Sequence, residues 1–113
     1  MRLINALSAL SGAFALAALA AAHHLAAPDA AQGVVLAGIV ELAAACAGLA
    51  IANRAGRFNM IAGALILAGA TLFAGEIYVH AFLNNAAFEP LAPVGGAISI
   101  AGWILLAFAA PRA

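Results

Sequence analysis

Four long apolar stretches separated by short polar segments dominate the pattern of this chain. They run over residues 3–22, 33–52, 60–83 and 91–110, and the segments between them hold histidine, arginine, asparagine, proline and acidic residues. About 20 apolar residues suffice for a helix to cross a hydrocarbon core of about 30 Å. Helices suit such segments because lipid offers no partners to backbone polar groups. The pattern therefore predicts an all-α integral membrane protein with four transmembrane helices.

The connections between the stretches are short, and they predict how the helices are ordered. Short connections place consecutive helices side by side and antiparallel, so we expect one domain over residues 1–113 with an up-down-up-down bundle. The first stretch, with Arg2 before it and Ala20–Ala22 at its end, resembles a signal peptide. We expect it to stay as an uncleaved helix, because cleavage would leave three spans.

Composition agrees with a lipid environment and narrows the possible partners. Hydrophobic residues make up 68% of the chain and charged residues only 7%, whereas a soluble domain carries about 25% charged residues. The chain has no lysine, and four scattered arginines cannot form the basic patch that nucleic acid requires. Cys46 is the single cysteine, which excludes an intramolecular disulfide and a thiolate metal cage. We expect the bilayer, other membrane subunits or further copies of this chain as partners, and no nucleic acid.

The arginines predict the orientation of the helices. They precede the first stretch, lie between the second and third, and follow the fourth: Arg2, Arg54, Arg57 and Arg112. With four spans these three places share one side of the membrane, and arginine-rich short loops are cytoplasmic. Asp29 and Glu89 lie in the two opposite loops, which contain no arginine. We therefore expect both termini in the cytoplasm and the protein in a bacterial inner membrane.

Small residues recur along the stretches and predict close packing. The glycines of the last two stretches are Gly63, Gly69, Gly75, Gly95, Gly96 and Gly102. Between helices in lipid there is no hydrophobic driving force, so residues that let backbones approach closely become the main source of association. Pro93 falls in the first turn of the fourth helix, where its missing N–H costs nothing.

Three ionisable residues lie inside the apolar stretches. They are Glu41, Glu76 and His80, with His23 and His24 at the end of the first stretch. A charge in a span costs about 2.5–3.5 kcal/mol, so such residues are functional candidates. Measured from Gly33 at about 1.5 Å per residue, Glu41 is expected about 12 Å deep, and Glu76 and His80 at about 10 and 5 Å below Leu83. All of them are therefore expected in the outer half of the membrane.

This set of side chains suits more than one role. Glu76 and His80 are four residues apart and share a helix face, while Tyr78 points elsewhere. With His24 and Glu41 they would suit a divalent metal in a bundle core or a proton relay. The structural alternative is that Glu76 only pairs with His80, and that Glu41 faces polar groups of a neighbouring subunit. The repeated Glu-x-x-His signature of ferritin-like bundles is absent from the sequence.

Several motifs resemble those of a known family. In the second half of the chain these motifs are Thr71–Tyr78, the Pro-x-Gly-Gly motif within Ala92–Gly96 and the Gly-Trp motif within Ala101–Trp103. In the first half they are Ser11–Gly12 and the Ala-His24-Leu end of the first stretch. Together they resemble the small four-span bacterial membrane proteins catalogued as domain of unknown function 423. The resemblance implies the same four-helix topology and a bacterial inner-membrane location, and it implies no activity.

The chain also departs from that family's pattern. Family members tend to carry Tyr-Gln-x-x-His in the second helix, whereas this chain has Glu41 in the corresponding stretch. Glu76-Ile77-Tyr78 replaces Ser-Leu-Tyr, and His80 stands where an apolar residue is usual. The resemblance therefore says nothing about the ionisable residues of this chain.

The sequence lacks the motifs of several common enzyme classes. No nucleophile elbow, phosphate loop or dinucleotide fingerprint is present. We therefore expect a non-enzymatic accessory or scaffold subunit of a larger membrane complex, with a metal- or proton-handling bundle built on His24, Glu41, Glu76 and His80 as the alternative. A small multidrug exporter is disfavoured, because its essential glutamate lies in the first helix, which has none here.

Overall fold

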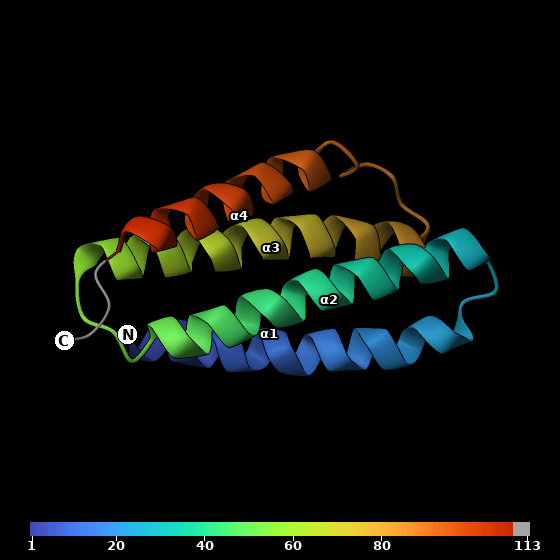
Figure 1. The fold of residues 1–113 in the computed structure, drawn as a ribbon. Coiled ribbons are helices and arrows are strands. Elements are labelled where there is room, and N and C mark those ends of the chain that lie inside the picture. Colours follow the sequence, from blue (N-terminus) through green and yellow to red (C-terminus); the bar gives the residue numbers. More distant parts are fainter. Residues whose placement is uncertain (110–113) are drawn as a thin grey trace.

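The computed structural model describes residues 1–109, which form four long helices and one short turn of 3-10 helix. Their bounds are α1 Arg2–Ala21, η1 Ala22–His24, α2 Pro28–Ile51, α3 Arg57–Leu83 and α4 Leu91–Phe108 (Figure 1). All four α-helices are long and apolar enough to cross a membrane. The predicted all-α architecture with four membrane-spanning helices is confirmed.

The helix ends differ from the apolar stretches where capping residues extend or stop a helix. α2 begins at Pro28, five positions before Gly33, because proline fits the first helical position and Asp29 favours the first turn. α3 begins after Gly56, whose φ of 108° is a conformation that glycine adopts without strain. The helix ends at Leu83, and Asn84 follows it as the C-cap in the left-handed conformation. The predicted fourth span reaches residue 110, which lies outside the described residues.

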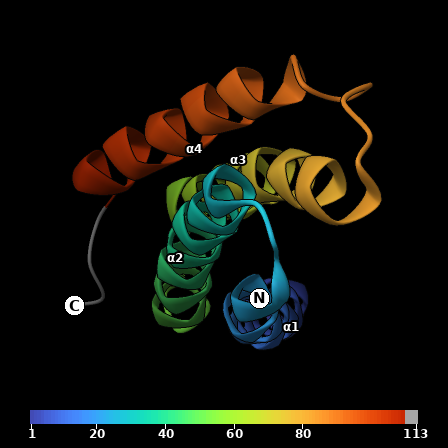
Figure 2. The same cartoon turned by 90° about the vertical axis from the view of Figure 1, so that its right-hand side faces the viewer.

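The helices pack in chain order. α1 packs on α2, α2 on α3 and α3 on α4, whereas α1 touches α3 only lightly. Among the described helices, α4 contacts α3 alone, and Figure 2 shows it crossing the side of α3 that faces away from α1. The start of α1, the α2–α3 connection and the end of α4 share one end of the molecule, as an up-down-up-down order requires (Figure 1). The bundle is therefore open between α1 and α4.

The α3–α4 contact depends on glycines that bring two backbones together. A Cβ on Gly69 would collide with the backbone of Ser99, one on Gly95 with the backbone of Phe73, and one on Gly102 with Ile66. The Ser99 hydroxyl donates a hydrogen bond to the carbonyl oxygen of Ile66 at 3.3 Å in this crossing. The prediction that small residues pack the helices is confirmed here.

The other glycines of α3 and α4 differ in what they contact. Gly63 makes room for the side chains of Ile51 and Ile4, which pack over it. A Cβ on Gly96 would meet only ordinary contact with Phe73, and one on Gly75 would meet nothing within 4 Å. Gly75 therefore borders open space, which the periodicity of small residues did not reveal.

Candidate functional site

Glu41 lies near the middle of α2. Counting from Pro28 at about 1.5 Å per residue, it lies about 20 Å along α2, whose 24 residues span about 36 Å. The sequence placed it about 12 Å deep because the apolar stretch begins only at Gly33. The residues by which α2 extends beyond that stretch include Pro28, Asp29 and Gln32, so the depth of Glu41 below the start of the apolar stretch stays a prediction.

Tyr78 is the partner of this carboxyl group. Its hydroxyl donates a hydrogen bond of 2.8 Å to Oε1 of Glu41, which joins α3 to α2. Both side chains are buried, with exposed fractions of 6% for Glu41 and 7% for Tyr78. The bond is internal to this chain, so the carboxyl oxygen does not depend on a neighbouring subunit for a donor.

Two phenylalanines hold the tyrosine ring in place. The ring centroids of Phe14 and Tyr78 are 5.5 Å apart and tilted by 44°, and those of Phe82 and Tyr78 are 6.5 Å apart. Such tilted pairs add to the packing energy of the rings. Sequence reasoning missed Tyr78, because its direction relative to Glu41 depends on how α2 and α3 are rotated against each other.

Glu76 and His80 form a second pair on a different face of α3. Oε1 of Glu76 lies 3.9 Å from Nδ1 of His80, as the spacing of four residues predicts. The Glu76 side chain is 6% exposed and that of His80 is 52% exposed. The carboxyl group is therefore enclosed, and the imidazole is open to the surroundings.

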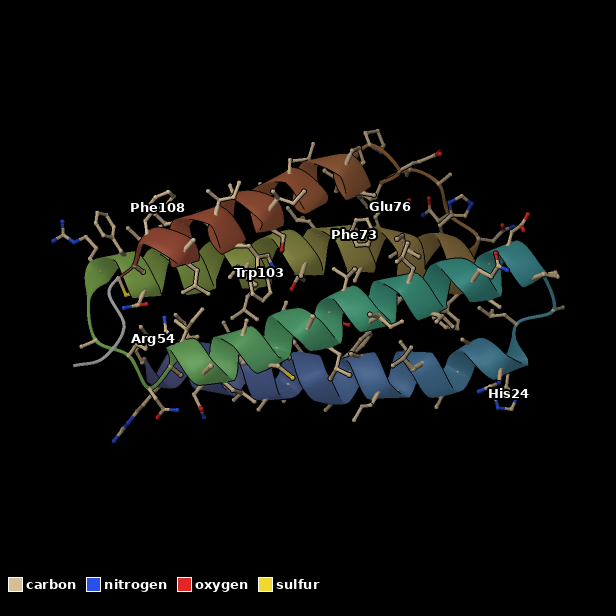
Figure 3. All side chains as sticks on the ribbon, in the orientation of Figure 1. His24, Arg54, Phe73, Glu76, Trp103 and Phe108 are labelled. Carbon is tan, nitrogen blue, oxygen red and sulfur yellow. The ribbon has the colours of Figure 1, made fainter. Side chains whose placement is uncertain are left out.

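The face of α3 that carries Glu76 also carries α4. Gly69 meets Ser99 and Gly95 meets Phe73, so in the antiparallel register Glu76 falls opposite Ala92 in the first turn of α4. Figure 3 shows Glu76 beside the start of that helix. A carboxylate at a helix N-terminus is stabilised by the free N–H groups and the helix dipole. The register thus places Glu76 level with the first turn of α4.

The two histidines after α1 remain apart from both pairs. His23 and His24 are exposed in η1, and Figure 3 shows His24 at the end of the molecule beyond α1. Tyr78 and Glu76 are separated by two positions, which is about 200° around a helix. α3 therefore stands between the Glu41–Tyr78 pair and the Glu76–His80 pair.

Of the four residues that the sequence grouped together, the structure brings only Glu76 and His80 into contact. Within residues 1–109, no group of three or more His, Cys, Asp or Glu side chains is arranged to hold a metal ion. A set of ligands for a divalent metal needs such convergence, since one carboxylate and one imidazole leave most coordination positions open. The carboxyl group of Glu41 instead offers one buried acceptor site beside a phenol.

Comparison with known proteins gives a family and no structural relative. No solved structure matches this chain. A family model matches residues 21–96, which is more than half of the chain and includes Glu41, Tyr78, Glu76 and His80. The chain therefore belongs to the family described as "Protein of unknown function (DUF423)".

Proposed function

We propose that this chain is a small non-enzymatic protein of the bacterial inner membrane that serves as an accessory or scaffold subunit of a larger membrane complex. The observation that carries the proposal is the open packing of α4, which contacts α3 alone among the described helices. A helix with one neighbour leaves most of its apolar surface for other proteins or lipid. In this arrangement both termini face the cytoplasm.

The exposed surface of α4 is large and apolar. Its exposed large apolar side chains are Leu91, Val94, Ile100, Trp103, Ile104 and Phe108. Trp103 is 45% exposed although it lies within the helix. Tryptophan is enriched among residues that dominate protein interfaces, because it buries much area at little entropic cost. This face therefore suits the docking of a partner's transmembrane helix.

The connections between helices support a role inside the membrane. The segments between the described helices are residues 25–27, 52–56 and 84–90, which are too short to form a domain of their own. Contacts with partners must therefore come mainly from helix faces. An accessory subunit acts through such contacts.

The test is the composition and native mass of the particle purified in mild detergent through a tag on this chain. We expect other membrane subunits in a fixed ratio, and we expect Trp103→Ala to reduce their recovery. Ile39→Ala, which removes an exposed apolar side chain from α2, is the matched control and should leave recovery unchanged. A particle that contains this chain alone, as monomer or homo-oligomer, would reject the accessory role.

The alternative is a protein that handles protons or metal ions. The observation in its favour is the enclosed Glu76 carboxyl beside the accessible His80 imidazole. In this arrangement the exposed imidazole can pass protons between the buried carboxyl group and the surroundings. The double variant Glu76→Gln/His80→Ala should then lose metal content or proton flux in reconstituted vesicles. His23→Ala, an exposed histidine outside both pairs, is the control. Unchanged metal content and unchanged flux in the double variant would reject the alternative.

A further inference from the structure

A groove of about 990 Å³ runs along the molecule between α1 and α3. It exists because α1 packs mainly on α2 and only lightly touches α3. One wall is made by large apolar side chains that recur every three or four residues of α1: Leu3, Leu7, Leu10 and Phe14. Its volume lies at the upper end of the range of about 300–1,000 Å³ for small-molecule sites.

The opposite wall is made by residues of α3. Four residues with small side chains follow a similar spacing, Ala64, Ala68, Thr71 and Gly75, and larger ones line the groove beside them: Leu67, Leu72, Tyr78 and Val79. A Cβ on Gly75 would meet no atom within 4 Å, so the space beside it is open. The small side chains of α3, and Gly75 in particular, therefore leave open space between α1 and α3.

The groove has a polar end. Glu41, Tyr78 and Phe14 all line it, and the Tyr78 hydroxyl binds Oε1 of Glu41. The second carboxyl oxygen, Oε2, has no hydrogen-bond donor among residues 1–109. A carboxyl group with an open acceptor therefore lies in an otherwise apolar groove.

This carboxyl group also lacks a counter-charge. No cationic side chain among the described residues forms an ion pair with Glu41. Arg2, Arg54 and Arg57 lie at helix ends, and His80 pairs with Glu76 on the other side of α3. A carboxylate in the membrane core is costly without a partner, so a cation that can dissolve in lipid is its natural complement.

We propose that the groove between α1 and α3 binds lipophilic amines, with the protonated amine on Glu41 and the apolar body against α1 and α3. The ammonium N–H groups donate to Oε2 of Glu41, and the aromatic residues Phe14 and Tyr78 line the same groove. An acid would meet like charge at Glu41, and a neutral alcohol would leave the charge uncompensated. The apolar walls select lipid-soluble molecules, and the carboxyl group selects amines among them.

Binding is measured by calorimetry on the full chain in phosphatidylcholine nanodiscs, with empty nanodiscs subtracted. The probe is phenylbutylamine, and phenylbutanol and phenylbutanoic acid are the matched neutral and acidic compounds. We expect saturable binding of the amine at one site per chain and no saturable binding of the other two. Glu41→Gln should weaken amine binding about thirtyfold or more, because an ion pair buried in the groove is lost.

Two further variants separate binding from folding. Glu76→Gln removes the other carboxyl group of the spans, which faces α4, and should leave amine binding unchanged. Gly75→Leu places a side chain in the open part of the groove without a collision at its Cβ, and should abolish binding while Glu41 and the helical content stay intact. Far-ultraviolet circular dichroism and thermal unfolding of each variant report on folding.

Three results would overturn the proposal. Equal binding of amine, alcohol and acid would mean that the groove holds apolar chains, such as lipid tails, without regard to charge. A homodimer that Gly75→Leu dissociates would mean that a second copy of this chain fills the groove. Amine binding that survives both Glu41→Gln and Gly75→Leu would place the amine elsewhere or in the lipid.

Discussion

The hydroxyl of Tyr78 donates a hydrogen bond of 2.8 Å to Oε1 of Glu41, across 37 positions in the sequence. This bond joins α3 to α2 inside the bundle, where an unpaired polar group is costly. Glu76 and His80 lie on another face of α3 and take no part in it.

We expect Glu41 and Tyr78 to be energetically coupled. Hydrogen bonds between membrane helices contribute about 0.6 kcal/mol on average and up to about 1.7 kcal/mol. Tyr78→Phe keeps the ring contacts with Phe14 and removes only the donor. A double-mutant cycle with Glu41→Gln and Tyr78→Phe, measured as free energy of unfolding in mixed micelles, should give coupling in this range. Strictly additive effects would show that the bond contributes nothing to stability.

The α3–α4 crossing should tolerate no side chain at Gly69. An added Cβ would collide with the backbone of Ser99, which cannot move without displacing α4. Gly69→Ala should therefore lower the free energy of unfolding by about 1–3 kcal/mol. Gly75→Ala, on the same helix with free space around it, is the control and should be neutral or stabilising by up to about 1 kcal/mol. Thermal unfolding in detergent distinguishes the two, and equal effects would argue against the close crossing.

Glu76 should stabilise the start of α4. The α3–α4 register places it level with the first turn of that helix, and a carboxylate near a helix N-terminus is worth about 0.3–1 kcal/mol. Glu76→Gln should therefore increase amide hydrogen exchange in the first turns of α4, around Val94 and Gly95, more than around Ile104. Glu41→Gln, a carboxyl change on α2, should not produce this gradient. Uniform exchange along α4 in the Glu76 variant would contradict the register given above.

The orientation of the chain should follow the arginines. In a Cys46→Ser background, a cysteine at Ala55 in the α2–α3 connection should be shielded from a membrane-impermeant maleimide in intact cells. A cysteine at Asn85 in the α3–α4 connection should react, since its loop contains no arginine. Replacing Arg54 and Arg57 with glutamine should weaken this asymmetry. Labelling at Ala55 together with protection at Asn85 would mean the opposite orientation.

The number of helices and their order followed from the sequence alone, and their ends followed to within a few residues. Apolar length decides whether a segment can span lipid, and this property is local to each stretch. The pairing of Glu76 with His80 was also local, because four residues bring two side chains onto one face of any helix. The family resemblance, carried by motifs such as Pro-x-Gly-Gly, was likewise a property of the sequence and agreed with the family match.

The start of α2 and the identity of the partner of Glu41 were decided by structure. α2 starts at Pro28, because capping preferences extended the helix beyond its apolar stretch. Tyr78 meets Glu41 because of how α2 and α3 are rotated and staggered, which depends on contacts such as Gly33 against Ile77. The open groove beside them exists because α1 approaches α2 more closely than α3. Periodicity determines which face of a helix carries small or large side chains. Only packing in three dimensions determines which neighbouring helix that face contacts.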